Sequence, residues 1–564
     1  MDFKKEIATK VSVVVGLQLD ELMGMLEVPP NPDMGDYALP CFKLAKKMRK
    51  APNFIAADLV AQIDWDHYID KVENVGGYVN FYIDKALLAK VILERIQEEK
   101  DRYGSSIEGQ GKTICIDYSS VNIAKPFSIA HLSTTAIGNS LYKIYEFLGY
   151  KCVGINHLGD WGTQFGKLIV AYKKWGNKEE IDAQLIKGLL DIYVKFHEEA
   201  EKDPTLEDEA RYWFKKIEDG NEEALALFDW FKEITMNEVQ RVYDMLGIQF
   251  DSYAGESFYN DKMDRTIALL KEKNLLKESQ GAMIVDLEPY HLPPCLILKS
   301  DGATLYATRD ITAAIYRKET YDFYKSLYVV AYQQNLVFQQ LFKVIELMKF
   351  DWYKDLEHVA FGMVSMEDGT MSTRKGKVVF LEDVLNRAVE KTLEIIKEKS
   401  PNLENKEEVA KKVGIGAIIF NDLSNNRIKD IVFSWDRVLN FDGETGPYVQ
   451  YSYARACSVL AKAGVLLEGV VDYQVLTDED AQTVLRMLGK FPEIVIEACH
   501  RNEPSMITRH IVNIAQAFNK FYYERRIIDD NPTIQKTRLS LVAAVQTVLR
   551  TGLSLLGIDA PERM

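Results

Sequence analysis

Hydrophobic positions between residues 113 and 176 alternate between two spacings. An apolar run at 113–116 is typical of a short buried strand, and residues 132–148 carry apolar side chains at helical spacing up to Gly149. A second apolar run at 152–156 and another helical pattern follow. Helices join parallel strands in this order, because the chain must return to the same end of the sheet. The pattern predicts a parallel α/β sheet.

The regions on either side have different patterns. Residues 1–110 combine helical segments with an alternating strand at Tyr78–Ile83, which predicts an α+β module. Residues 177–235 are acidic and helical, as expected of an insertion, and the chain from Glu382 onward is almost entirely helical in pattern. Further sheet-like segments occur at 282–287, 295–299, 327–331 and 358–364.

Size and composition limit the class of protein. The chain has 564 residues and 47% hydrophobic content, enough for several buried cores. It contains no apolar stretch long enough to span a membrane and no apolar signal segment, so we expect a cytoplasmic protein. Its six cysteines are scattered without a C-x-x-C, which favours free thiols over zinc. A net charge of −15 does not exclude nucleic acid, because binding depends on local basic patches such as Lys43–Lys50.

Two polar turns follow the first two strands expected in the sheet. The first, Asp117–His131, leads into a helix, and the second contains His157–Asp160. A helix start offers unpaired N–H groups and the positive end of a dipole, and open α/β sheets bind ligands at the carboxyl ends of their strands. The two turns therefore indicate a phosphate or nucleotide site.

Several motifs resemble those of arginyl-tRNA synthetases, a class I aminoacyl-tRNA synthetase family. In chain order they are DYSSVNIAKPFSIAH, NHLGDWGTQFG, LYATRD, AYQQN, GTMSTRKGKVVFLEDVL, GPYVQYSYAR, EPSMITRHIVNIAQAFNKFYYERRI and GLSLLGIDAPERM. Each alone is weak, but the ordered set is specific and spans nearly the full length. The resemblance implies a class I Rossmann-like parallel sheet as catalytic domain, an N-terminal α+β module and a C-terminal all-helical anticodon-binding domain.

The resemblance also implies domain limits and a reaction. The expected parts are a tRNA-elbow module at 1–110, a catalytic domain at 111–380, a helical connection at 381–440 and an anticodon-binding domain at 441–564. The reaction is activation of L-arginine by ATP to arginyl-adenylate, followed by transfer to the terminal adenosine of tRNA(Arg). ATP with Mg²⁺ is expected as substrate, with no prosthetic group, no membrane partner and a monomeric protein.

The family motifs place the site residues in four sets. The catalytic set comprises Lys125, Ser128 and His131. The ATP-binding set comprises Asn122, Ala130, His131, His157, Gly159, Asp160, Met371 and Ser372. The arginine-binding set comprises Asp117, Asn122, Tyr306, Asp310 and Gln334. The tRNA-binding set comprises Tyr78, Asn80, Tyr448, Tyr451, Arg455, Tyr522 and Met564. Carboxylates suit the planar, permanently charged guanidinium of arginine, and aromatic side chains suit unpaired bases.

The sequence departs from the family pattern at several positions. Ser128 and Ala130 replace the first His and the Gly of the HIGH signature, and Ser133 and Val337 replace an Arg and a His. The KMSKS counterpart, at 370–374, lacks its leading lysine, and the family pattern implies that Lys125 supplies that charge instead. These departures leave open a catalytically weakened paralogue that binds tRNA or arginine as a regulator. A class I synthetase for another amino acid and a non-synthetase adenylate-binding protein are less consistent with two acidic pocket residues and the helical C-terminal domain.

Overall fold

The computed structural model describes residues 2–29, 31–300, 304–366, 379–464 and 470–564. These residues form two compact units, each built from more than one stretch of chain. The first comprises 1–103, 456–490 and 516–548, and the second comprises 104–455, 491–515 and 549–564. The four C-terminal helices are divided between them. Their bounds are α18 (Gly446–Ala463), α19 (Glu479–His500), α20 (Ser505–Glu524) and α21 (Pro532–Leu555).

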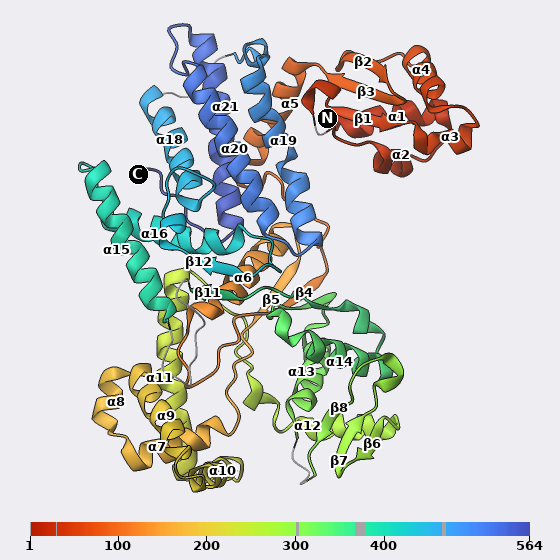
Figure 1. Ribbon diagram of the computed structural model, residues 1–564. Coiled ribbons are helices and arrows are strands. Elements are labelled where there is room, and N and C mark those ends of the chain that lie inside the picture. Colours follow the sequence, from red (N-terminus) through yellow and green to blue (C-terminus); the bar gives the residue numbers. More distant parts are fainter. Residues whose placement is uncertain (1, 30, 301–303, 367–378, 465–469) are drawn as a thin grey trace. The chain divides into compact units, whose positions relative to one another are not determined.

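The first unit contains a three-stranded antiparallel sheet in the order β1-β3-β2 (Figure 1). Alternation along β3 places Val79 and Phe81 in the core, with Trp65 against the Phe81 ring at 5.1 Å. The strands are β1 (Tyr37–Pro40), β2 (Ile69–Val75) and β3 (Tyr78–Ile83). The helices of this module are α1 (Phe3–Val15), α2 (Leu19–Met25), α3 (Phe42–Met48), α4 (Pro52–Gln62) and α5 (Lys85–Glu99).

The second unit is organised around a four-stranded parallel sheet in the order β10-β9-β4-β5. Its strands are β4 (Thr113–Asp117), β5 (Lys151–Ile155), β9 (Lys325–Tyr328) and β10 (Leu356–His358). The helix α6 (Leu132–Phe147) joins β4 to β5 and ends two residues before Gly149. The predicted order of strand, polar turn, helix and strand is confirmed.

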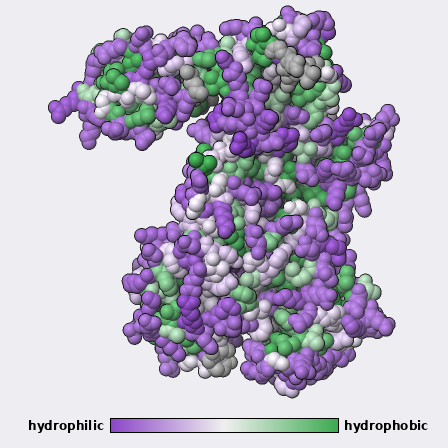
Figure 2. Space-filling view, turned by 180° about the vertical axis from the view of Figure 1, so that it is seen from behind, coloured by the Kyte–Doolittle hydropathy of each residue, from purple (hydrophilic) through white to green (hydrophobic). Residues whose placement is uncertain are grey.

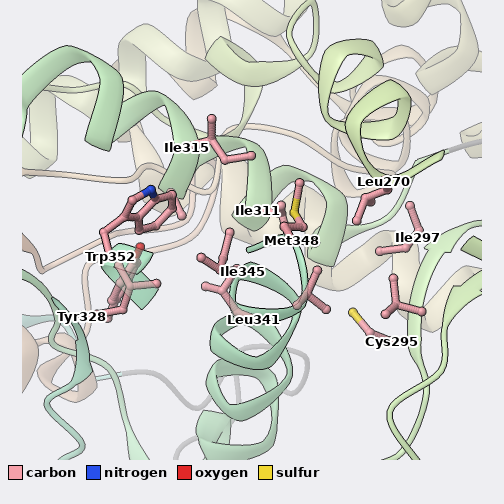
Figure 3. Close-up of a cluster of buried hydrophobic side chains, with 14 of the residues drawn as sticks. Leu270, Cys295, Ile297, Ile311, Ile315, Tyr328, Leu341, Ile345, Met348 and Trp352 are labelled. Atoms are coloured by element: carbon pink, nitrogen blue, oxygen red, sulfur yellow. The ribbon is translucent and has the colours of Figure 1, made fainter. Parts of the chain in front are cut away.

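A second sheet in this unit is antiparallel and contains β6 (Leu276–Ser279), β7 (Ala282–Val285) and β8 (Cys295–Leu298). It packs with the parallel sheet and two helices around one hydrophobic cluster (Figure 3). The helices are α13 (Tyr306–Tyr321), which contributes Ile311 and Ile315, and α14 (Asn335–Leu347), which contributes Leu341 and Ile345. This packing fixes α13, which carries Tyr306 and Asp310, against the sheet.

The segment between β5 and β6 is helical. It contains α7 (Gln164–Trp175), α8 (Lys178–Gln184), α9 (Ile186–Ala200), α10 (Thr205–Glu218), α11 (Glu222–Leu246) and α12 (Met263–Glu272). The remaining elements of the unit are β11 (Val364–Met366), α15 (Leu381–Lys399), α16 (Lys406–Leu423), β12 (Ile431–Phe433) and α17 (Trp435–Val438). The strand β12 pairs in parallel with β11, so the region after residue 382 is not helical throughout. Hydrophilic residues cover most of the face seen in Figure 2. No helix within the described residues is long and apolar enough to cross a bilayer.

Candidate active site at the carboxyl end of the parallel sheet

The two polar turns meet at the carboxyl ends of β4 and β5. The Ile123 amide donates to the Gly159 carbonyl at 3.1 Å, and the Gly159 amide donates to the Val121 carbonyl at 2.9 Å. A Cβ atom on Gly159 would lie 2.3 Å from the Asn122 side-chain oxygen, so a larger residue here would displace the Asn122 side chain. The two polar turns, which are separate motifs in the sequence, therefore lie together at one edge of the sheet.

The imidazole of His131 is held in one orientation by Ser128. The Ser128 amide donates to Nδ1 of His131 at 3.2 Å, and the Ser128 hydroxyl lies 3.1 Å from the same nitrogen. The Ser128 carbonyl also lies 3.3 Å from Nδ1, so three groups of Ser128 surround this nitrogen. Burial lowers the pKa of His131 to about 4. The imidazole is therefore neutral near pH 7, and the buried Ser128 fixes its orientation.

Lys125 and Ala130 occupy the same loop. The Lys125 side chain is half-buried. Its charge adds to the fall that burial causes in the pKa of His131 and opposes the rise that burial causes in the pKa of Glu256. Ala130 lies in the single 3₁₀ turn Ile129–His131 that precedes α6, where it is partly exposed. The loop therefore brings one cation and one neutral imidazole to the start of a helix.

Asp117, the last residue of β4, is paired with a guanidinium of the chain itself. Arg317 Nη2 lies 2.8 Å from Asp117 Oδ2, and the two side chains are 1% and 8% exposed. The Ser120 hydroxyl donates to the other carboxylate oxygen at 2.8 Å. The Arg317 guanidinium also lies 5.5 Å from the centre of the Tyr328 ring. Both oxygens of Asp117 are engaged inside the unit.

Asp310 is on the same helix as Arg317 but has a different environment. It is partly exposed, and burial together with nearby Asp117 raises its pKa to about 6. Glu256 lies close to it, with its Oε2 atom 4.0 Å from Arg309 Nη1, and burial raises the pKa of Glu256 to about 7. Tyr306, at the first position of α13, is exposed. Asp310 and Glu256 thus form a pair of carboxyl groups whose ionised forms are disfavoured by burial, and the Arg309 guanidinium lies 4.0 Å from Glu256.

Asp160 and His157 bind neighbouring parts of the protein. Lys232 Nζ lies 2.8 Å from Asp160 Oδ2, and the amide and hydroxyl of Ser257 donate to Asp160 at 2.8 and 2.6 Å. His157 Nδ1 donates to the Ala254 carbonyl at 3.2 Å, and burial lowers the pKa of its ring. Both residues fix the segment that carries Glu256 beside the second polar turn.

Of the other residues predicted to bind substrate, one lies in a turn that follows a strand of the parallel sheet. Gln334 is exposed in the 3₁₀ turn Tyr332–Gln334, which follows β9. Met371 and Ser372 lie outside the described residues. The chain just after them is described, and its Val379 carbonyl accepts from the Ile129 amide at 3.0 Å, while the Leu381 amide donates to Phe127 at 2.9 Å. The chain that follows the KMSKS counterpart thus pairs with the loop that carries His131.

The residues predicted for tRNA fall in both units. In the first, Tyr78 is exposed and lies edge-on to Phe42, while Asn80 is only 2% exposed and its amide oxygen has no partner among the described residues. Direct contact with RNA by Asn80 would require this burial to change. Tyr522 is half-buried in the first unit, where it lies against Phe518.

The second unit holds the other residues predicted for tRNA. On α18 the Arg455 guanidinium lies 5.0 Å over the Tyr451 ring, which is 42% exposed, and Tyr448 is half-buried one turn earlier. Met564 packs partly buried on the cluster of Ile396, Val409, Ala410 and Val413. The helical spacing predicted for the Tyr451 and Arg455 contact is present.

Some residues of the site were not found from the sequence. Glu256 stands in a polar stretch without a periodic pattern. It is placed beside Asp310 by hydrogen bonds of its own amide to Leu158 and of the neighbouring Ser257 amide to Asp160. Arg317 follows Asp310 by seven residues, two helical turns, and this spacing could have indicated that it shares a face with Asp310. Arg309 belongs to the LYATRD motif, but the sequence predicted no role for it.

Comparison with known proteins identifies the family of the chain. The family "tRNA synthetases class I (R), catalytic domain" matches residues 93–435. "Arginyl tRNA synthetase N terminal domain" matches 1–83, and "DALR anticodon binding domain" matches 449–564. The chain is 58% identical to arginine–tRNA ligases of Alkaliphilus metalliredigens and Clostridioides difficile, each covered over 100% of both chains.

Solved structures agree with this assignment at the level of the fold. Thermus thermophilus arginyl-tRNA synthetase superimposes with a TM-score of 0.84 at 24% identity, over 99% of both chains. The Plasmodium falciparum arginyl-tRNA synthetase gives 0.80 at 22% identity, again over 99% of both chains. The family matches cover more than half of the chain, and the curated relatives cover all of it. The chain therefore belongs to the arginyl-tRNA synthetase family of class I aminoacyl-tRNA synthetases.

Proposed function

We propose that this chain is an arginine–tRNA ligase that forms arginyl-adenylate from L-arginine and ATP and transfers arginine to tRNA(Arg). The observation that carries this is the pair Asp310 and Glu256 beside the loop of Lys125 and His131. A pair of carboxyl groups with raised pKa values, in which Glu256 Oε2 is buried without a hydrogen bond among the described residues, is suited to a cationic side chain from outside. Its position beside a phosphate-binding loop suits the joining of arginine to a nucleotide.

In adenylate formation the carboxylate of arginine is the nucleophile. Its oxygen forms a bond to the α-phosphorus of ATP, and the bond from that phosphorus to the bridging oxygen breaks, releasing pyrophosphate. The protein supplies no covalent group, so catalysis consists of positioning and of stabilising charge on the phosphate oxygens. Lys125 supplies a positive charge, and the imidazole of His131 supplies a hydrogen bond. The amides at the start of α6 add the positive end of the helix dipole.

The family pattern and the geometry together suggest how arginine is oriented. Asp310 and Glu256 receive the guanidinium, and Tyr306 borders it at the start of α13. Asn122 and Gln334 hold the α-amino end, nearer the phosphates. Asp117 contributes indirectly in this account, because both of its oxygens are used by Arg317 and Ser120.

The ATP subsite uses the two joined turns. Gly159 keeps the second turn close to Asn122, and Ala130 borders the nucleotide at the start of α6. His157 and Asp160 support these turns through their bonds to Ala254 and Ser257. Met371 and Ser372 complete the ATP subsite, and Mg²⁺ enters with ATP as part of the substrate.

Recognition of tRNA is assigned to a mainly aromatic set of side chains, of which Tyr78 and Tyr451 are exposed. Tyr78 stacks or packs on the elbow of the tRNA, with Asn80 beneath it, while Tyr448, Tyr451 and Arg455 contact the anticodon loop. Tyr522 and Met564 complete the anticodon contacts. Aromatic stacking on unpaired bases contributes about 1–3 kcal/mol for each base. The protein acts as a monomer in the cytoplasm.

An ATP–pyrophosphate exchange assay with single amino acids, with and without tRNA, tests this function. We expect exchange with arginine and not with lysine or methionine. The tRNA arm is needed because the family usually requires tRNA for exchange. A weakened regulatory paralogue would bind arginine or tRNA without exchange in either arm, and that result would contradict the proposed function.

A further inference from the structure

The helix α11 contacts the loop that carries Lys125 and His131 through three side chains on one face. They are Thr235, Glu238 and Tyr243, all of them buried. No family motif includes them, and they lie more than 100 residues after the loop in the chain. Figure 1 shows α11 extending from the helices of the insertion into the central part of the unit.

Two of these side chains satisfy amides of the loop itself. Thr235 Oγ1 accepts from the Ala124 amide at 3.0 Å, and Glu238 Oε1 accepts from the Phe127 amide at 3.5 Å. These two amides flank Lys125 and Pro126. The amides of Ile123 and Ile129 are instead met by backbone carbonyls of other segments. The position of the Lys125 backbone therefore depends on α11 on both sides.

The loop needs this support because its backbone is strained. Ala124 has φ of 61°, in the left-handed region that residues with a Cβ seldom adopt. Ser119 and Ser120 have φ of 68° and 46° in the same loop. Such conformations cost of order 1–3 kcal/mol each and persist only where the surroundings hold them. The amide of Ala124 is the one that Thr235 binds.

The third side chain links α11 to His131 and to the strand ends. The Tyr243 hydroxyl lies 2.7 Å from the Ser119 hydroxyl and accepts from Asn156 Nδ2 at 2.8 Å. Its ring is edge-on to Phe127 at 5.5 Å, and Phe127 is edge-on to His131 at 5.5 Å. A shift of α11 would move the whole series of rings.

The surroundings of Glu238 show that it is a demanding group to bury. Its pKa is raised to about 7, mainly by burial and in part by Glu382, while the bond from the Phe127 amide and the charges of Arg241 and Lys187 oppose the rise. Arg241 itself pairs with Glu382 at the start of α15 at 3.2 Å. A buried carboxyl group carries a desolvation cost, and here it faces the loop and accepts from the Phe127 amide.

We infer that Thr235 and Glu238 are positioning residues of the adenylate-forming site, holding the 124–127 backbone so that Lys125 and His131 face the α-phosphate. This inference rests on the proposed function and adds a role for the insertion helix. Neither residue touches substrate. They act through the loop, so their loss should lower kcat and leave arginine binding by Asp310 nearly unchanged.

The test uses the full-length protein in arginine-dependent ATP–pyrophosphate exchange with tRNA. Thr235→Val and Glu238→Met remove the acceptors at similar side-chain volume, while Thr235→Ser and Glu238→Gln keep them. We expect the first pair to lower kcat about 10- to 100-fold with the arginine KM changed by less than about threefold, because misplacement of a catalytic group acts on the transition state. The second pair should retain nearly wild-type kcat.

Two control variants separate positioning from packing. Thr392→Val on α15 removes a buried hydroxyl that donates to the carbonyl four residues earlier, at 2.7 Å, as the Thr235 hydroxyl donates to Phe231. Among the described residues the Thr392 side chain has no hydrogen bond to the loop. Glu233→Met alters an exposed glutamate on α11. Equal kcat for Thr235→Val and wild type, or an equal loss in Thr392→Val, would overturn the inference. Absence of exchange by the wild-type protein would instead refute the proposed function.

Discussion

Asp117 binds the guanidinium of Arg317 at 2.8 Å in the interior of the second unit, at the carboxyl end of β4. The family motif assigns this aspartate to the guanidinium of substrate arginine. The pair is 8% and 1% exposed, so the cation that Asp117 neutralises is part of the protein. Burial alone would disfavour the charge on Arg317, and Asp117 keeps its pKa well above the usual value.

Asp117→Asn should destabilise the second unit. The substitution leaves Arg317 buried without its counter-charge, and breaking a buried ion pair costs about 3–5 kcal/mol. The midpoint of thermal unfolding measures the effect. The matched control is Glu319→Gln, which breaks the pair of Glu319 with Arg265 on the surface of the same helix and should cost less than about 1 kcal/mol. Equal midpoints for Asp117→Asn and wild type would show that the pair is not structural.

Asp310→Asn should raise the arginine KM at least about tenfold, because a charged hydrogen-bond acceptor for the guanidinium is lost. The fold should be intact, since the charge on Asp310 is already disfavoured by burial. Steady-state exchange kinetics measure KM, and circular dichroism verifies the fold. The control is Asp322→Asn, because Asp322 stands at the C-terminal end of the same helix and its side chain is 93% exposed. An unchanged KM in Asp310→Asn would remove this residue from the pocket.

Lys125→Ala should lower kcat for adenylate formation about 100-fold or more, as expected for loss of one group that stabilises transition-state charge. The arginine KM should change little, because Lys125 belongs to the phosphate side of the site. Lys151→Ala, at the exposed amino end of β5, provides the comparison. Near-normal kcat in Lys125→Ala would show that another cation, such as one of the basic residues at 374–377, supplies the charge.

Asp422→Asn should stabilise the protein at alkaline pH and not at acidic pH. Asp422 accepts from the Ser133 hydroxyl at 2.6 Å, its other oxygen is buried without a partner among the described residues, and burial raises its pKa from 3.8 to about 6. A raised pKa stabilises the fold below about pH 4, and that contribution is lost as the pH rises through 6. Asparagine does not ionise, so the Asp422→Asn protein does not lose this stability as the pH rises.

We therefore expect the unfolding midpoints of Asp422→Asn and wild type to diverge as the pH rises from 5 to 8. At pH 8 the free energy of unfolding of Asp422→Asn should exceed that of the wild type by about 1–3 kcal/mol. Position 133 is one of the departures from the family motif, and its serine hydroxyl is the donor to Asp422. A difference between the two proteins that is the same at both pH values would contradict the assignment to Asp422.

The sequence predicted those parts of the site that follow from local order along the chain. The strand β4, the polar turn and α6 occur where the apolar spacing predicted them. Arg317, Glu256 and Glu238 could not be predicted in this way. Their roles come from contacts with Asp117, Arg309 and Phe127, which are distant in sequence.

Strand signals also did not specify which sheet a strand joins. The segments at 282–287 and 295–299 were recognised, but they form the antiparallel sheet with β6 and not part of the parallel sheet. The short pair of β11 with β12 joins residues more than 60 positions apart. Such pairing is decided by packing of whole elements, which a local pattern does not contain.

Charging of tRNA(Arg) with labelled amino acid tests the central claim most directly. Citrulline has nearly the shape of arginine but a neutral side chain, so a pocket with two carboxyl groups should discriminate strongly between them. We predict that the full-length protein charges tRNA(Arg) with arginine in the presence of ATP and gives no measurable product with citrulline or lysine. Failure to charge with arginine, or equal charging with citrulline, would contradict the assignment of this chain as an arginine–tRNA ligase with Asp310 and Glu256 in its pocket.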